Sequence, residues 1–284
     1  MTLVERHTQL GGRARMWHTE GYSFDMGPSW YWMPDVFEHF FESLGERVHD
    51  HYELVRLDPG YRVVFGDTQV DVDANRSGLT RWLEEREPGS GRALKQFLAE
   101  AEEKYRVGMG DLVYRPGRSL LEFADARVLR GLLRLQLLTS MRRHVQQHFR
   151  DPLIRQLLEF PVLFLGAVAA DTPALYSLMN HADLELGTWY PMGGMVQVVH
   201  AMERIARARG IDIRTSTEAV RIHTEGRRAV ALELRSAPTE DGAAAPADQR
   251  DLLTADVFVA SADYHHVDSV LLGAGRANYG ARYW

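Results

Sequence analysis

A strand–helix–strand pattern constrains the fold more than any other feature of this 284-residue sequence. The segment from Trp189 to Ile222 starts with a short apolar run and a Gly-Gly turn, continues with apolar residues at helical spacing, and ends in a strand-like stretch. Strands that alternate with helices are typical of α/β proteins. We therefore expect an α/β fold.

The remaining stretches divide into strand-rich and helix-rich regions. Residues 2–5 resemble the end of a short strand, and residues 33–44 have helical spacing. Turn signals at Pro59-Gly60 and Gly66-Asp67 predict strands between 53 and 74. Residues 76–180 are expected to be mostly helical, with breaks at prolines. We predict a further strand at 227–236, a solvated hairpin loop at 237–251 and a last buried strand at 254–263.

The composition excludes several classes of function. The chain has no cysteine, so thiolate catalysis, disulfides and cysteine-ligated metals are excluded. A net charge of -6 gives no sequence-wide attraction to nucleic acid, and no nucleic-acid partner is expected. No uncharged run has the length of a transmembrane helix.

Three short motifs near the start suggest a nucleotide site. Glu5 follows a strand-like "TLV", where an acid in a dinucleotide fold accepts hydrogen bonds from ribose hydroxyls; the alternative is a solvated Glu. Gly11 and Gly12 would let a phosphate approach the backbone and Arg13 could pair with it, unless they form a plain tight turn. The sequence "FDMGPSW" predicts a rigid loop, poor in side chains, against which a flat ring could lie.

These motifs resemble flavin-dependent carotenoid desaturases of the bacterial phytoene desaturase type, which belong to the amine-oxidase-like flavoproteins. The resemblance rests on "GGRA", "GYSFDMGPS", the segment from Trp189 to Ile222 and "DVFVASADYHH". It implies FAD as the cofactor and desaturation of phytoene or a related carotenoid precursor as the reaction, with the hydride chemistry supplied by the flavin. The alternatives are a carotenoid isomerase, another amine-oxidase-like flavoprotein such as a polyamine or retinoid oxidoreductase, and an inactive lipid-binding fragment.

The resemblance assigns residues to the cofactor and none to catalysis. It implies a ribose-binding acid, a turn at the diphosphate, a loop near the isoalloxazine ring, and a backbone that meets the adenine. The ribose-binding acid is Glu5, and the diphosphate turn is Gly11, Gly12 and Arg13. The loop near the isoalloxazine ring is Gly27, Pro28 and Ser29, and the backbone that meets the adenine is that of Val220.

The resemblance also implies a domain order. We expect a partial Rossmann-like FAD-binding domain that lacks the family's first βα unit, with a substrate domain that has a mixed or antiparallel sheet and a helical insertion. The family's C-terminal segment is missing as well, so the chain alone should bind FAD poorly and be inactive. The predicted segments are 1–50, a first FAD-binding segment; 51–75, substrate-domain strands; 76–188, a helical region that contacts substrate and membrane; and 189–284, a substrate-domain strand followed by a second FAD-binding segment.

Two predictions about the sheets follow from this order. Thr2–Glu5 and Asp256–Ala260 should lie in one parallel sheet, because both are short apolar runs that suit a sheet covered on both faces. Strands within Glu53–Asp73 should form a different sheet, joined to the strand–helix unit that begins at Trp189.

The central segment 115–155 carries nine arginines and three acids. Arginines interleaved with apolar residues are typical of a helix on an anionic membrane, and also of a core helix with a solvated face. The resemblance favours the membrane, because the implied substrate is an apolar polyene. We therefore expect a peripheral protein on the cytoplasmic face of a bacterial membrane. The oligomeric state is open. The apolar run at 157–170 could line a tunnel or belong to the core.

The histidine pairs do not predict a metal site. His265 and His266 are adjacent, so in a strand their side chains would point to opposite faces. His144 and His148 have a zinc-compatible spacing, but no Glu follows His144 to complete an HExxH motif. We expect no metal from the sequence.

Overall fold

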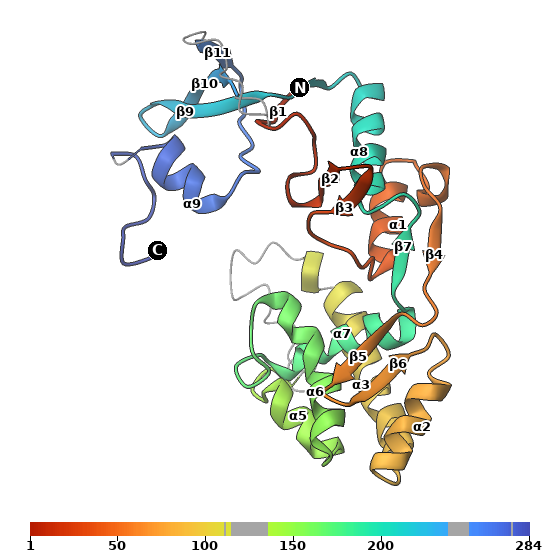
Figure 1. Cartoon of the computed structure of the whole chain (residues 1–284). Coiled ribbons are helices and arrows are strands. Elements are labelled where there is room, and N and C mark those ends of the chain that lie inside the picture. The colour runs from red at the N-terminus through yellow and green to blue at the C-terminus, as the bar shows by residue number, and fades with distance from the viewer. Residues whose placement is uncertain (111, 115–135, 238–249, 274) are drawn as a thin grey trace. The chain divides into compact units, whose positions relative to one another are not determined.

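The computed structural model describes residues 1–110, 112–114, 136–237, 250–273 and 275–284, and its elements are labelled in Figure 1. The chain forms two compact units, of which the first joins Met1–Pro28 to Gly193–Trp284 and the second is Ser29–Met192. The elements of the first unit are β1 (Thr2–Val4), η1 (Gly12–Ala14), β2 (Met16–Thr19), β3 (Tyr22–Asp25), α8 (Val196–Ala208), β8 (Asp212–Arg214), β9 (Thr217–Glu225), β10 (Arg228–Ser236), β11 (Arg250–Thr254), α9 (Tyr264–His266) and η8 (Val267–Leu271).

The first unit contains the helix and the second strand of the predicted strand–helix–strand pattern, and the first strand, β7 (Trp189–Pro191), belongs to the second unit. Helix α8 leads into β8, which pairs in parallel with β1 in the register Thr2↔Asp212 to Val4↔Arg214. Strands β9, β10 and β11 form a separate antiparallel sheet in that order, and β2 and β3 form a hairpin. The prediction of a strand at 227–236 is confirmed by β10.

The predicted partner of β1 is wrong. Asp256–Ala260 forms no strand, and Val257 and Val259 are 76% and 82% exposed. The last strand is β11, which ends at Thr254 and pairs with β10 instead. An apolar run becomes a buried strand only when a neighbouring strand offers its backbone groups, and in the described part of the chain β1 pairs with β8 alone.

The second unit confirms the prediction of a separate sheet. Strand β4 pairs antiparallel with β7, from Leu54↔Pro191 to Arg56↔Trp189, and β5 with β6 forms a hairpin. Its elements are α1 (Pro34–Ser43), η2 (Val48–Asp50), β4 (Leu54–Arg56), β5 (Tyr61–Phe65), β6 (Thr68–Val72), α2 (Ser77–Arg86), α3 (Ser90–Gly110), η3 (Leu112–Tyr114), α5 (Met141–His148), α6 (Pro152–Glu159), η5 (Phe160–Leu165), η6 (Ala174–Ser177), α7 (Leu178–His181), η7 (Ala182–Leu186) and β7 (Trp189–Pro191).

The unit boundaries differ from the predicted segment boundaries. Residues 29–50 belong to the second unit, whereas the sequence placed them in the segment 1–50. Backbone and side-chain bonds explain the difference. Tyr31 N donates to Trp189 O at 3.0 Å, and the Tyr31 and Tyr52 hydroxyls lie 2.9 Å apart in the interior.

The main core of the second unit lies among helices α2, α3, α5 and α6 and the hairpin β5–β6, which are drawn together in Figure 1. Proline starts one of these helices as expected: α6 begins at Pro152, with Asp151 Oδ1 accepting hydrogen bonds from the amides of Leu153 and Ile154. Among the described residues, none of the helices combines the length and the apolar character needed to cross a bilayer.

Two predictions fall largely outside the described residues. The basic segment 115–155 is described only from residue 136 onward, and the polar loop at 237–251 only at its two ends. The membrane helix and the hairpin loop therefore remain predictions.

Candidate functional site

A cationic cavity of about 860 Å³ lies in the first unit, beside the residues that follow β1. In parallel sheets, ligands bind beyond the carboxyl ends of the strands, which is where Arg6 and His7 lie. Three arginines against a single glutamate give the cavity its positive charge. It is lined by Arg6, His7, Gln9, Arg15, Met16, Trp17, His18, Met26, Glu218, Arg235 and Ala237.

A second cavity of about 600 Å³ shares Gln9, Met16 and His18 with the first. It reaches the start of α8 through Gly193 and Gln197. Because three residues line both cavities, the two hollows adjoin one another. Each has the volume of a typical small-molecule site.

The charges of the larger cavity differ in how they are held. Arg235 is paired with Glu218 at 2.8 Å across β9 and β10. Arg15 Nε donates to Gly12 O at 2.9 Å, which fixes its guanidinium beside the turn at η1. Arginine is suited to phosphate because its planar group presents several N–H donors. The cavity can therefore accept an anionic ligand.

Glu5 is fixed by its own backbone. Its N–H donates to Arg214 O and its carbonyl accepts from Thr217 N, both at 2.9 Å, so it lies between the end of β8 and the start of β9. One carboxylate oxygen, Oε1, accepts from His7 N at 2.8 Å. This hydrogen bond orients the Glu5 carboxylate next to Arg6 and His7, the first residues that line the larger cavity.

Of the three glycines predicted for the site, Gly27 and Gly11 lie close to other parts of the unit, whereas a Cβ on Gly12 would meet nothing within 4 Å. Gly27 lies so near the opposite segment that a Cβ atom on it would be 2.2 Å from Arg13 O. Gly11 has φ 104°, a left-handed conformation that favours glycine, and a Cβ there would lie 2.8 Å from Val199 Cγ2. Gly27 is therefore required for the two loop segments to pack, and Gly11 for the left-handed turn beside α8.

Val220 lies at an irregularity in the sheet. The register passes from Arg221↔Glu233 to Ala219↔Leu234, so Val220 has no partner on β10. Such a residue is the extra residue of a β-bulge, which leaves the regular ladder of hydrogen bonds. Its backbone can therefore meet a ligand in a way that a regular strand residue cannot.

Other predicted residues are placed less directly. The side chain of Arg13 is exposed and is not among the residues that line either cavity, whereas Arg6 and Arg15 line the larger one. Pro28 ends the first unit and Ser29 begins the second, and both are exposed. The sequence missed Arg6 and Arg15, although both flank the acid and glycines that drew attention.

The second unit holds a buried carboxyl beside aromatic rings. Tyr61 Oη donates to Asp183 Oδ2 at 2.5 Å, and Trp30 stacks on the Tyr61 ring with centroids 4.8 Å apart. Burial raises the pKa of Asp183 to about 7, which favours the protonated acid over the carboxylate. No sequence motif marked this pair.

Comparison with known proteins gives one family. The model of flavin-containing amine oxidoreductases matches residues 1–267. A carotenoid 3,4-desaturase of Haloarcula japonica is 36% identical over 100% of this chain and 55% of its own length. A zeta-carotene-forming phytoene desaturase of Myxococcus xanthus is 33% identical over 82% of this chain and 45% of its own. The chain thus spans about half the length of the curated relatives it matches.

Solved structures share the fold at low sequence identity. A Pyrococcus furiosus protein superimposes with a TM-score of 0.54 and 16% identity, covering 99% of this chain and 56% of that one. A putrescine oxidase variant gives a TM-score of 0.51 at 15% identity, over 82% of this chain and 48% of that one. Both comparisons support an α/β architecture of mixed helix and sheet.

Proposed function

Because the chain belongs to the flavin-containing amine oxidoreductase family, we propose that the protein uses FAD to desaturate phytoene or a related carotenoid precursor. The curated relatives named above include carotenoid and phytoene desaturases, and this supports the substrate class. A flavin follows from the family; FAD in particular, and a Rossmann-like arrangement around it, are our proposals. The observation that carries them is the cationic cavity beside Glu5.

The residues of the first unit fit FAD in three ways. Oε1 of Glu5 is used by His7 N, which leaves Oε2 to accept from a ribose hydroxyl. Arg6 and Arg15 offer positive charge to a diphosphate at the cavity wall. The bulge at Val220 presents backbone toward an adenine edge.

A bound flavin supplies a two-electron acceptor for hydride from an unactivated carbon chain. The task of this chain is then to hold the cofactor and to orient the substrate. The closeness of Gly27 to Arg13 O keeps side chains out of that region of the loop, so a flat ring could lie against backbone.

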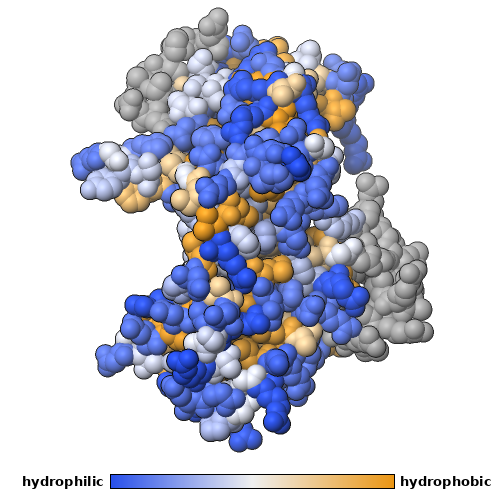
Figure 2. Space-filling model, turned by 90° about the vertical axis from the view of Figure 1, so that its right-hand side faces the viewer, coloured by the Kyte–Doolittle hydropathy of each residue, from blue (hydrophilic) through white to orange (hydrophobic). Residues whose placement is uncertain are grey.

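An apolar polyene requires an apolar surface, and the second unit has one. Phe164 packs with Trp30 and Trp32 at centroid distances of 5.7 and 4.9 Å. Figure 2 shows hydrophobic residues between polar ones on the visible face of the molecule. The large apolar residues exposed along η5 and just after it are Leu163, Phe164, Leu165 and Val168.

We propose that this exposed stretch of η5 inserts into the surface of a membrane that stores the substrate, on its cytoplasmic face. Bilayer insertion of apolar side chains is favourable in proportion to the area that leaves water. Replacing Leu163 and Phe164 by Ser should reduce co-sedimentation with phospholipid vesicles. Unchanged co-sedimentation would rule out this surface as the contact.

The decisive experiment measures flavin retention and product together. The purified protein is incubated with FAD, its flavin absorbance is measured after gel filtration, and its product from phytoene is identified by polyene absorbance. Glu5→Gln should weaken FAD affinity by about tenfold or more, because a charge-assisted hydrogen bond contributes about 1.5–3 kcal/mol.

Glu20→Gln is the matched control, because Glu20 is an exposed acid on the β2–β3 turn of the same unit. Equal FAD affinities for the two variants would contradict the role of Glu5. A flavin-loaded protein that isomerises its polyene without adding a double bond would support the isomerase alternative and overturn the desaturase.

A further inference from the structure

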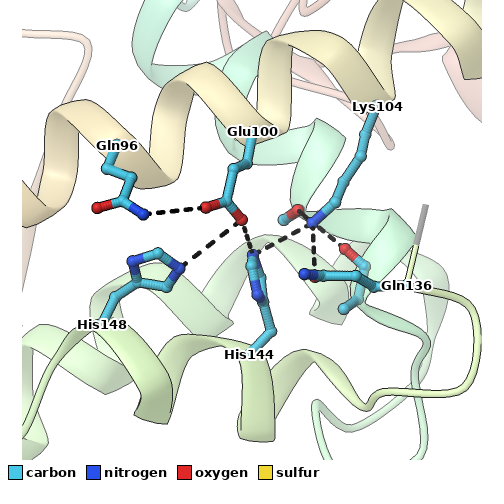
Figure 3. A network of polar contacts seen from close by, with 8 residues as sticks. Gln96, Glu100, Lys104, Gln136, His144 and His148 are labelled. Atoms are coloured by element: carbon cyan, nitrogen blue, oxygen red, sulfur yellow. Dashed lines mark hydrogen bonds and ion pairs between the residues drawn. The ribbon is translucent and has the colours of Figure 1, made fainter. Parts of the chain in front are cut away.

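Three side chains of metal-ligand type converge between two helices of the second unit. Glu100 projects from α3, and His144 and His148 project from α5 (Figure 3). Glu100 Oε2 lies 3.8 Å from Nε2 of each histidine. One ligand atom from each of the three lies within 4.8 Å of the others.

The spacing of these atoms suits a small divalent cation. They form a triangle with two sides of 3.8 Å and a third of at most 4.8 Å. A point equidistant from all three lies about 2.1–2.5 Å from each, close to the ~2.0–2.2 Å of zinc bonded to imidazole nitrogen or carboxylate oxygen. Side-chain shifts of a few tenths of an ångström would complete the bonds.

The ring of His144 is held in place by the interior of the second unit. His144 has no exposed surface, and the ring of Phe97 stacks on it at 5.2 Å. A neutral imidazole offers the lone pair that a metal needs.

The carboxylate is oriented by a neighbour. Gln96 Nε2 donates to Glu100 Oε1 at 3.4 Å and lies one turn earlier on the same helix face. This leaves Oε2, the other oxygen, facing the histidines. Such outer partners orient ligands in metal sites.

Lys104 competes for the same lone pair. Its Nζ lies 3.2 Å from Nε2 of His144, and also 2.9 Å from Ser177 Oγ and 3.1 Å from Gln136 Oε1. Ser177 Oγ and Gln136 Oε1 can still accept hydrogen bonds from Lys104 Nζ when His144 Nε2 binds a metal instead. A positive charge this close nevertheless repels a cation, so Lys104 should weaken binding without preventing it.

We propose that Glu100, His144 and His148 form a zinc-class binding site that ties α3 to α5. This site is independent of the flavin and of the cavity in the first unit. The residue set favours zinc, since two imidazoles with one carboxylate is a known zinc donor set and both helices are rigid supports. The sequence missed it because Glu100 lies 44 positions before His144.

The test is a zinc titration of the purified protein against a chromophoric chelator, with thermal unfolding measured in the same samples. One zinc per chain should bind, and zinc should raise the unfolding temperature. Glu100→Gln and His148→Gln should each weaken zinc affinity by about tenfold or more. His144 is left intact, because its complete burial makes a substitution there a risk to folding.

Two control variants should leave zinc binding unchanged, and a third variant should strengthen it. Glu102→Gln removes an exposed acid from the same helix, and His49→Gln removes an exposed histidine of the same unit; both should bind zinc as the wild type does. Lys104→Met should tighten zinc binding by about tenfold or more, because the competing charge is removed. Absence of one-to-one binding, or equal weakening by the controls, or weaker binding by Lys104→Met, would overturn the proposal.

Discussion

Replacing Gly27 by alanine tests whether the loop beside the cavity depends on a backbone contact. A Cβ at Gly27 would lie 2.2 Å from Arg13 O, well inside the 3.0 Å below which real Cβ atoms are essentially never found. The opposing atom belongs to the backbone, so no side-chain rotation relieves the clash. The two segments must separate, and forcing extra volume into a packed contact typically costs about 1–3 kcal/mol.

Hydrogen exchange gives a local measurement of that cost. The amide of Met26 donates to Arg15 O at 3.0 Å, one residue before Gly27. If the opening free energy of this segment falls by about 1–3 kcal/mol, the Met26 amide should exchange about 5- to 150-fold faster. Peptides that cover β2 and β3 report it by mass spectrometry.

Gly280→Ala is the matched control. Gly280 lies in the same unit, has no left-handed φ, and a Cβ there would meet nothing within 4 Å. Its opening free energy from hydrogen exchange and its free energy of unfolding should both stay within about 0.5 kcal/mol of the wild-type values. If Gly27→Ala behaves like Gly280→Ala, the close approach at Arg13 does not constrain the loop and the argument is refuted.

Two further predictions concern single carboxyl groups. Asp25 Oδ1 accepts a hydrogen bond from Met195 N at 2.9 Å at the start of α8. Asp25→Ala should therefore lower the free energy of unfolding, measured by urea titration, by about 1 kcal/mol, and Asp25→Asn should lower it by less. Equal losses for the two variants would contradict the capping role. Burial raises the pKa of Asp183 to about 7, above ~3.9 in the unfolded chain. The folded state therefore holds this proton more tightly than the unfolded chain does. The stabilisation that results is full below pH ~4 and is lost as pH rises to about 7. Asp183→Asn should remove that decline, and an identical pH profile for variant and wild type would contradict it.

The sequence predicts elements well where the pattern is local. The strand–helix–strand pattern from Trp189 is observed as β7, α8 and β8, whereas the sheet of β4 with β7, also observed, was expected from the family resemblance. Helical spacing and turn signals are properties of neighbouring residues, so they survive in any packing arrangement. The prolines that begin or end helices are local signals of the same kind.

Strand pairing is different, because it depends on residues far apart in the chain. Asp256–Ala260 has the short apolar run of a buried strand, yet Val257 and Val259 in it are exposed, and β11 pairs just before it. Nothing within a strand specifies which partner will be beside it. The metal-type cluster shows the same limit, since the spacing of His144 and His148 is visible in the sequence and the approach of Glu100 from α3 is not.

The proposed cofactor residues are hard to predict from the sequence for a second reason: several would act through their backbone and not through their side chains. Glu5 is positioned by main-chain bonds to Arg214 and Thr217, Gly27 by its distance from a carbonyl, and Val220 by a bulge in the register. Residue type can mark Glu and Gly as candidates, but a bulge at a valine has no compositional signature. The charged lining of the cavity is instead formed by side chains, Arg6 and Arg15, whose types are ordinary on any surface. The proposed flavin site would therefore be specified jointly by backbone and side chains. The glycines and the bulge would shape the backbone that approaches the ligand, and the arginines would add charge beside it.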